Sequence, residues 1–161
     1  MLPKVAVTAF LIVLASVSSG TAPTNCIDKV FEYGVHFDVS KVNEAGVRET
    51  WKTENPHEPG DIILWKRIHW NRGYVITRKC APCSPKTGIT ELFVTADEPG
   101  LPCGLNRGTL IDSILELMGE PHVRNEGELI YLCPPVNKNE EIAFQFKEGK
   151  LWGIKWSFYN D

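Results

Sequence analysis

The chain has 161 residues, with 17 lysines and arginines against 20 aspartates and glutamates, and its formal net charge is −3. Such a chain, without a cluster of basic residues among aromatic ones, offers little to a phosphate backbone, so we expect no nucleic-acid partner. Five tryptophans and seven phenylalanines supply bulk for one hydrophobic core in a chain of this length.

The start of the chain has the order of a secretory signal peptide. Lys4 precedes an apolar run over residues 5–17, and small residues occupy positions 18–20. The run is shorter than the roughly 18 apolar residues that a membrane-spanning helix needs. The residues before Cys26 lack the small-residue step of bacterial lipoprotein signals, so no stable membrane anchor is expected. We therefore expect residues 1–20 to be removed and residues 21–161 to form a single domain, periplasmic or secreted.

The cysteines indicate a disulfide-tied protein. All five lie beyond the expected cleavage point, in a compartment where disulfides persist: Cys26, Cys80, Cys83, Cys103 and Cys133. Two bridges and one spare thiol are the natural count, and with Cys26 as the spare the other four allow three connectivities. We favour Cys103 with Cys133, which would tie the loop before a helix to a strand after it, and Cys80 with Cys83 by default.

The first half of the exported region is expected to be sheet. Alternating apolar residues over 33–39 are typical of a half-buried strand, and a second strand is expected at 47–51. Residues 54–60 contain two prolines and a glycine and should form a loop. Segments 61–70 and 74–77 flank Asn71-Arg72-Gly73, which predicts a β-hairpin in which Gly73 supplies a positive φ. Residues 89–95 are expected to form another strand.

The pattern changes after Gly108. Thr109 can cap a helix with Asp112 three residues on, and apolar residues at helical spacing then predict a short amphipathic helix from Leu110 to Met118. The glycine at position 119 and the proline at 121 should end it. Because so short a helix is marginal alone, its apolar stripe should pack on the sheet.

Three strands are expected to close the chain, over residues 128–133, 142–147 and 151–158, with a turn at 148–150. Seven side chains of the last two strands should form the floor of the core beneath the helix: Ile142, Phe144, Phe146, Trp152, Ile154, Trp156 and Phe158. The fold class predicted is therefore α+β, an antiparallel sheet with one short amphipathic helix packed on it and disulfides that tie it together.

The second half of the exported chain has a recognisable order. A strand Ile89-Thr90-Glu91-Leu92-Phe93-Val94 leads to a helix that ends Leu117-Met118-Gly119-Glu120-Pro121, and a meander then ends in Gly149-Lys150-Leu151. From Ile89 to Phe158 the chain resembles the module of small bacterial envelope proteins of the SmpA/OmlA group and of the β-lactamase-inhibitor-protein-like fold. The resemblance implies a non-enzymatic binding module of the cell envelope, either an assembly-factor subunit or an inhibitor of an extracellular enzyme. SmpA/OmlA proteins are lipoproteins and are compact, whereas this chain lacks the lipid signal and adds a Trp-rich segment at 33–78, which favours the inhibitor.

Motifs for catalysis and metal binding are weak. Cys80-Ala81-Pro82-Cys83 has the spacing of a thiol-disulfide active site, but a turn-rich segment follows it where a helix would be needed, which favours a structural bridge. Zinc would need two more ligands, and no second pair has matching spacing. No nucleophile elbow and no His-Glu-x-x-His motif is present. We therefore expect that the protein is not an enzyme and has no catalytic residues, no metal and no cofactor.

The candidate binding residues gather around the predicted hairpin. Interface hot spots favour Trp, Tyr and Arg, and Trp65, Trp70, Arg72 and Tyr74 all fall near Asn71-Arg72-Gly73. Trp70 and Arg72 abut the turn and are the predicted binding residues, whereas Trp65 and Tyr74 are equally compatible with packing in the core.

The sequence thus predicts an exported non-enzymatic binding protein that acts on another envelope or secreted protein, as an inhibitor or immunity protein would. The alternatives are a structural subunit of outer-membrane assembly and an extracytoplasmic thiol oxidoreductase.

Overall fold

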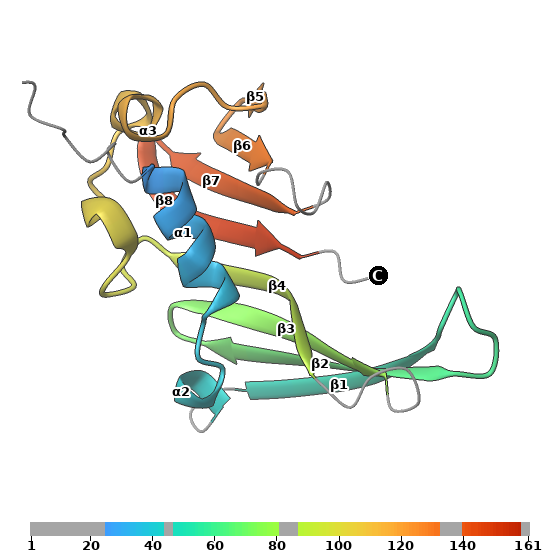
Figure 1. Ribbon diagram of the computed structural model, residues 1–161. Coiled ribbons are helices and arrows are strands. Elements are labelled where there is room, and N and C mark those ends of the chain that lie inside the picture. Colours follow the sequence, from blue (N-terminus) through green and yellow to red (C-terminus); the bar gives the residue numbers. More distant parts are fainter. Residues whose placement is uncertain (1–24, 44–46, 81–86, 133–139, 159–161) are drawn as a thin grey trace, which may run out of the picture.

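The structure is a computed structural model that describes residues 25–43, 47–80, 87–132 and 140–158. Within these ranges it has one antiparallel sheet of eight strands in the order β1-β2-β3-β4-β8-β7-β6-β5, with helices packed against it (Figure 1). The strands are β1 Val47–Glu54, β2 Ile62–Trp70, β3 Gly73–Cys80, β4 Gly88–Thr95, β5 Val123–Asn125, β6 Glu128–Leu132, β7 Glu141–Lys147 and β8 Lys150–Ser157. The predicted α+β class is confirmed.

The predicted hairpin of the first half is present, and a second hairpin, formed by β1 and β2, precedes it. β1 and β2 pair over eight residues each, and the two-residue connection Asn71-Arg72 joins β2 to β3. Gly73 has a φ of 157°. A Cβ at this position would collide with the carbonyl oxygen of Phe93 on β4, so the close approach of β3 and β4 here requires glycine.

The strand predicted over residues 33–39 is wrong, because the segment begins inside helix α1 Cys26–Val35. Asn25 caps this helix, accepting a hydrogen bond from the Ile27 N–H at 3.4 Å. Ile27, Val30 and Gly34 are buried on one side of the helix. The helical spacing of apolar residues begins before residue 33, and it gives the helix an apolar face that packs on the sheet. This packing outweighs the shorter alternating pattern over residues 33–39.

Trp156 of β8 is where α1 docks on the sheet. Its side chain is fully buried, and its indole Nε1 donates to the carbonyl oxygen of Val30 at 2.9 Å. Gly34, one turn further along the helix, lies directly against the indole ring. The helix therefore crosses the sheet at the position of β8, as Figure 1 shows.

The predicted helix over 110–118 is confirmed as α3 Ile111–Met118, with Ile114 and Met118 buried in the core. The predicted cap is wrong: the Thr109 hydroxyl accepts from the N–H of Asn106 at 3.0 Å, and Leu110 stands at the capping position without a side-chain bond. Gly119 ends the helix with a φ of 80°, as predicted.

The C-terminal hairpin β7–β8 turns through Glu148 and Gly149, both with positive φ, at 51° and 73°. This is the backbone that a two-residue hairpin turn prefers. Six of the seven side chains that the sequence predicts as the floor of the core do lie in the core: Ile142, Phe144, Phe146, Ile154, Trp156 and Phe158. Trp152 lies outside the core and faces the other side of the sheet.

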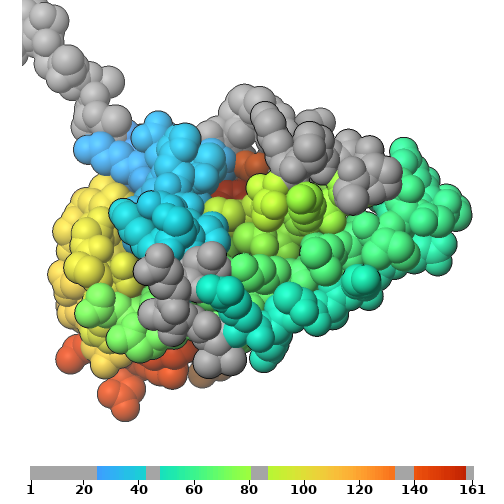
Figure 2. Space-filling model, turned by 90° about the horizontal axis from the view of Figure 1, so that it is seen from below, coloured from blue at the N-terminus to red at the C-terminus, as the bar shows by residue number. Residues whose placement is uncertain are grey.

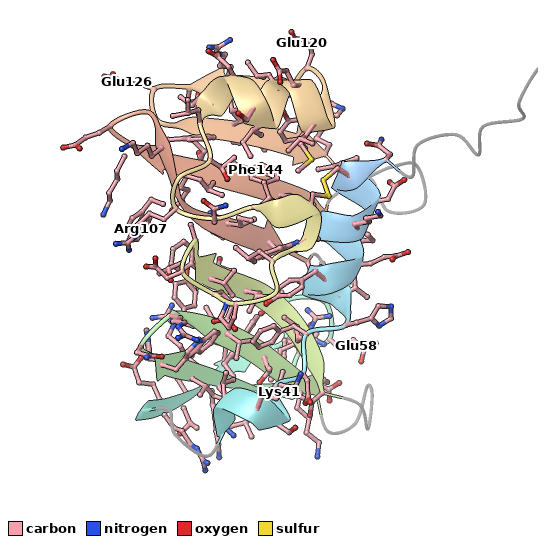
Figure 3. All side chains as sticks on the ribbon, turned by 90° about the vertical axis from the view of Figure 1, so that its left-hand side faces the viewer. Lys41, Glu58, Arg107, Glu120, Glu126 and Phe144 are labelled. Atoms are coloured by element: carbon pink, nitrogen blue, oxygen red, sulfur yellow. A yellow bond between two sulfur atoms is a disulfide. The ribbon has the colours of Figure 1, made fainter. Side chains whose placement is uncertain are left out.

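The disulfide differs from the predicted pairing. Cys26 at the start of α1 is bonded to Cys103 in the short helix η1 Pro102–Gly104, with their Cα atoms 6.2 Å apart (Figure 3). Cys26 is therefore not a spare thiol, and the predicted Cys103–Cys133 bridge is wrong, because α1 brings the N-terminal cysteine to the loop before α3. Cys80 is also disulfide-bonded. The predicted partners Cys83 and Cys133 lie outside the described residues.

The remaining helix, α2 Ser40–Asn43, is short and contributes Val42 to the core. None of the helices in the described parts of the chain is long and apolar enough to cross a membrane.

Candidate binding face

The sheet has one face covered by helices and one face that they leave open. All the α-helices in the described ranges contribute to the core, for example through Val30 of α1, Val42 of α2 and Ile114 of α3. Because side chains alternate along a strand, the other residues of each strand point away from these helices. We call this second surface the open face. Among the residues that the strand register places on it are Glu49, Trp51 and Thr53 of β1, Trp65, Arg67 and His69 of β2, Tyr74 and Arg78 of β3, Glu91 and Phe93 of β4, Gly153 and Lys155 of β8, and Ala143, Gln145 and Lys147 of β7.

Five aromatic rings cross the open face, and we call them the aromatic row: Trp65, Trp51, Tyr74, Phe93 and Trp152. Trp51 and Trp65 stack with centroids 6.0 Å apart and ring planes 4° from parallel. Tyr74 stacks on Phe93 at 5.6 Å, and Phe93 contacts Trp152 at 5.1 Å. Neighbouring rings thus hold one another in place across strands β1, β2, β3, β4 and β8.

Two cations complete the aromatic row. The guanidinium carbon of Arg67 lies 5.8 Å from the ring centroid of Trp51 and 5.6 Å from that of Tyr74, and so joins the tryptophan pair to the tyrosine. The Lys147 Nζ lies 3.7 Å from the ring centroid of Trp152 at the other end. Arg67 therefore lies between the tryptophan pair and the other three rings, and Lys147 lies at the end of the row.

Trp152 reaches the open face because of a bulge in the last hairpin. Gln145 of β7 pairs with Gly153, whereas the next residue, Phe146, pairs with Leu151. β8 therefore contains one residue more than β7 at this point, and that residue is Trp152. Leu151 takes the place in the core that simple alternation predicts for Trp152, and its side chain is fully buried.

Gly153 makes room for the centre of the aromatic row. A Cβ built on Gly153 would lie 2.5 Å from Cζ of Phe93, so the phenylalanine ring lies directly over the glycine. Covered by its neighbours, Phe93 is only 8% exposed even though it points away from the helices. A side chain at position 153 would push this ring out of the row.

Hydrogen bonds and charges fix the polar groups next to Arg67. The Tyr74 hydroxyl donates to Oε1 of Glu91 at 2.6 Å. Burial, followed by this hydrogen bond to the carboxylate, raises the pKa of Tyr74 well above its ordinary value, so the hydroxyl is protonated at neutral pH. Arg67 Nη1 lies 3.9 Å from a carboxylate oxygen of Glu49. Arg67 Nε is buried and has no hydrogen-bond partner among the described residues, so the guanidinium is oriented mainly by the flanking rings.

The residues predicted at the hairpin are not brought together. Trp70 is half-buried on the core side, where it stacks on Phe37 at 5.6 Å, whereas Trp65 lies on the open face near the middle of the same strand. Arg72 is half-buried in the turn, and its carbonyl oxygen accepts from the Thr95 N–H at 2.7 Å. The aromatic row includes Trp65 and Tyr74, which the sequence left undecided.

Sequence reasoning missed Trp51, Arg67, Phe93 and Trp152. Part of the signal was present, since Trp65 and Arg67 are two residues apart in a predicted strand and so must share a face. The sequence did not show which face the helices would leave open.

Groups for other kinds of chemistry are scarce in the described ranges. No three His, Cys, Asp or Glu side chains there are placed to hold a metal ion. A pocket at the tip of the β1–β2 hairpin is lined by two prolines with Glu54 and Asn55. No protein-family model, curated protein or solved structure matches the chain significantly. The open face is therefore the feature from which a function can be argued.

Proposed function

We propose that this chain is an exported, non-enzymatic binding protein that engages another envelope or secreted protein through the aromatic row, as an inhibitor or immunity protein of a bacterial competition system would. The observation that carries the proposal is the row itself. Trp, Tyr and Arg are the side chains that most often dominate the energy of protein interfaces, and here they lie side by side on one face. The resemblance of residues 89–158 to envelope and inhibitor modules supports the same class of function.

The geometry supports a rigid interface. Binding costs less conformational entropy when the side chains of a surface are already held in place. Each ring of the row contacts a neighbouring ring or cation. Trp51 is 37% exposed, and the side chain of Arg67 is 38% exposed. Both therefore keep surface that a partner can bury.

Arg67 is the expected centre of the interface. It lies between Trp51 and Tyr74, and guanidinium groups form paired hydrogen bonds with carboxylates. We expect the partner to present an acidic side chain or carbonyl oxygens here, framed by apolar atoms that cover the neighbouring tryptophans.

The experiment is a capture of the partner followed by its affinity for matched variants. The protein is produced with its own leader, purified from the extracytoplasmic fraction and immobilised, and the bound envelope proteins are identified by mass spectrometry. Arg67→Ala and Trp65→Ala should each weaken the complex about tenfold or more, as interface hot spots do. Leu64→Ala is the control, because Leu64 is 42% exposed but lies next to Trp65 on the other face of β2.

A single captured hydrolase whose activity the protein blocks would support the inhibitor role. Recovery of outer-membrane assembly components would favour the structural subunit instead. If folded Arg67→Ala and Trp65→Ala bind the captured protein as tightly as Leu64→Ala does, the aromatic row is not the interface.

A further inference from the structure

One edge of the sheet is long, regular and exposed. β1 is the outermost strand, and its eight residues pair with β2 without a bulge. Every residue from 48 to 54 is exposed. Seen from below, β1 lies at the surface and runs from α2 toward the projecting tip of the β1–β2 hairpin (Figure 2).

Proteins usually protect such edges, because an unpaired strand is a template for another chain. The strand at the opposite edge, β5, has only three residues and is too short to be a good template. β1 has no proline and no bulge to prevent pairing. The charged side chains of β1 therefore determine which strand can pair with it and in which register.

Symmetry limits how two copies of β1 can pair. In an antiparallel sheet that continues from one copy to the next, the twofold axis is perpendicular to the sheet, so both copies turn their open faces to the same side. Directly opposite residues must then share a face. One residue of β1 therefore lies on the axis, directly opposite the same residue of the second copy. Each possible register places a different residue of β1 on the axis.

The charges of β1 select one central register. With the axis at Trp51, Arg48 lies opposite Glu54 of the second copy, and the same pair forms again on the other side of the axis. Thr50 then lies opposite Lys52, and no like charges are opposed. The Glu54 carboxylate is already held at the strand end, where Oε1 accepts from the Gly60 N–H at 2.9 Å.

The neighbouring registers bring like charges together. With the axis at Thr50, Arg48 lies opposite Lys52 twice, and with the axis at Lys52 this lysine lies opposite itself. An axis at Glu49 opposes two copies of that carboxylate. Like charges directly opposite each other destabilise a strand pair, so these registers are disfavoured.

We propose that β1 pairs antiparallel with β1 of a second copy of this chain, with the twofold axis at Trp51. The pairing continues the sheet across two molecules. It also joins the two aromatic rows, because Trp51 already stacks on Trp65 and would meet Trp51 of the second copy. The proposal does not depend on the identity of the partner bound by the open face.

The first test is sedimentation velocity of the secreted protein over about 1 to 100 µM, a range that detects weak dimers. We expect a dimer that Arg48→Glu weakens about tenfold or more, because this variant opposes two glutamates on each side of the axis. The double variant Arg48→Glu/Glu54→Arg restores opposite charges and should restore the dimer. Lys52→Glu changes the net charge as much as Arg48→Glu does but faces Thr50, so it is the control.

The second test locates the axis. In the Trp51→Cys variant the two introduced cysteines lie directly opposite each other, within reach of a disulfide, so a covalent dimer should form on oxidation. In Thr53→Cys the introduced cysteines lie four residues apart along the strands, about 13 Å, which is too far for a disulfide.

A protein that is monomeric throughout this range would overturn the proposal, and so would a protein that pairs only with an added extended peptide. A dimer that Arg48→Glu leaves intact, that the double variant fails to restore, or that cross-links equally at positions 51 and 53 would overturn it as well. Circular dichroism of each variant separates loss of pairing from loss of fold.

Discussion

Gly34→Ala should destabilise this protein, although alanine is the better helix former. Gly34 lies in the last turn of α1 and does not have a positive φ, so its backbone gives no reason for glycine. Helix propensity alone would favour alanine by about 1 kcal/mol. The added Cβ, however, would lie 2.6 Å from Nε1 and 2.7 Å from Cγ of Trp156, well inside contact distance.

Neither side of this contact can yield without cost. Trp156 is fully buried, and its Nε1 is bonded to the Val30 carbonyl oxygen at 2.9 Å. Forcing an extra carbon into a packed core costs about 1–3 kcal/mol, and a buried donor that loses its partner costs about as much again. Against the gain of about 1 kcal/mol in helix propensity, we expect a net loss of about 1–5 kcal/mol in the free energy of unfolding.

The loss can be measured by urea unfolding, followed by circular dichroism and tryptophan fluorescence. Val35→Ala is the control, because Val35 is the next residue of the helix and is 43% exposed, and its change should stay within about 0.5 kcal/mol. Trp156→Phe removes Nε1, one of the atoms that the new Cβ meets, so this substitution should cost less in the Gly34→Ala background than in the wild type. A Gly34→Ala variant as stable as the wild type would refute the tight contact between α1 and β8.

Two further predictions concern the disulfide and the tyrosines. Replacing Cys26 and Cys103 with serine should lower the free energy of unfolding by about 4 kcal/mol, because the bridge closes a loop with a sequence separation of 77 in the unfolded chain; urea unfolding of both forms measures this, and a loss below about 1 kcal/mol would contradict it. Burial raises the pKa of Tyr33 and of Tyr131 from the ordinary value of 10.0 to about 12, and it also raises the pKa of Tyr74. Since the folded protein favours the protonated rings, the stability they contribute is complete below pH 10 and is lost as the pH rises through 12. In a pH titration, the tyrosinate absorbance of the folded protein should therefore appear at higher pH than that of the urea-unfolded chain. Coincident titration curves would contradict the burial of these rings.

The elements that the sequence predicted correctly are those that neighbouring residues specify. Glycines 73 and 149 mark the two tight hairpins, and the apolar spacing after Leu110 marks helix α3. A turn residue or a helical stripe acts over a few positions, so its signal is complete within a short window of sequence. Helix α1 carried such a signal too, with Asn25 as its cap, but the alternation over residues 33–39 obscured it.

The candidate site was harder to predict, because a strand alone does not show which of its faces the helices cover. Alternation placed Trp65 and Trp70 on opposite faces of β2, but only the position of α1 and the ring of Phe37 made the Trp70 side the interior. A single extra residue in β8 moved Trp152 to the open face. The sequence by itself thus determined the hairpins, helix α3 and the mixed α and β composition. The tertiary structure alone decided the Cys26–Cys103 bridge and the aromatic row, because both depend on contacts between segments that are far apart along the chain.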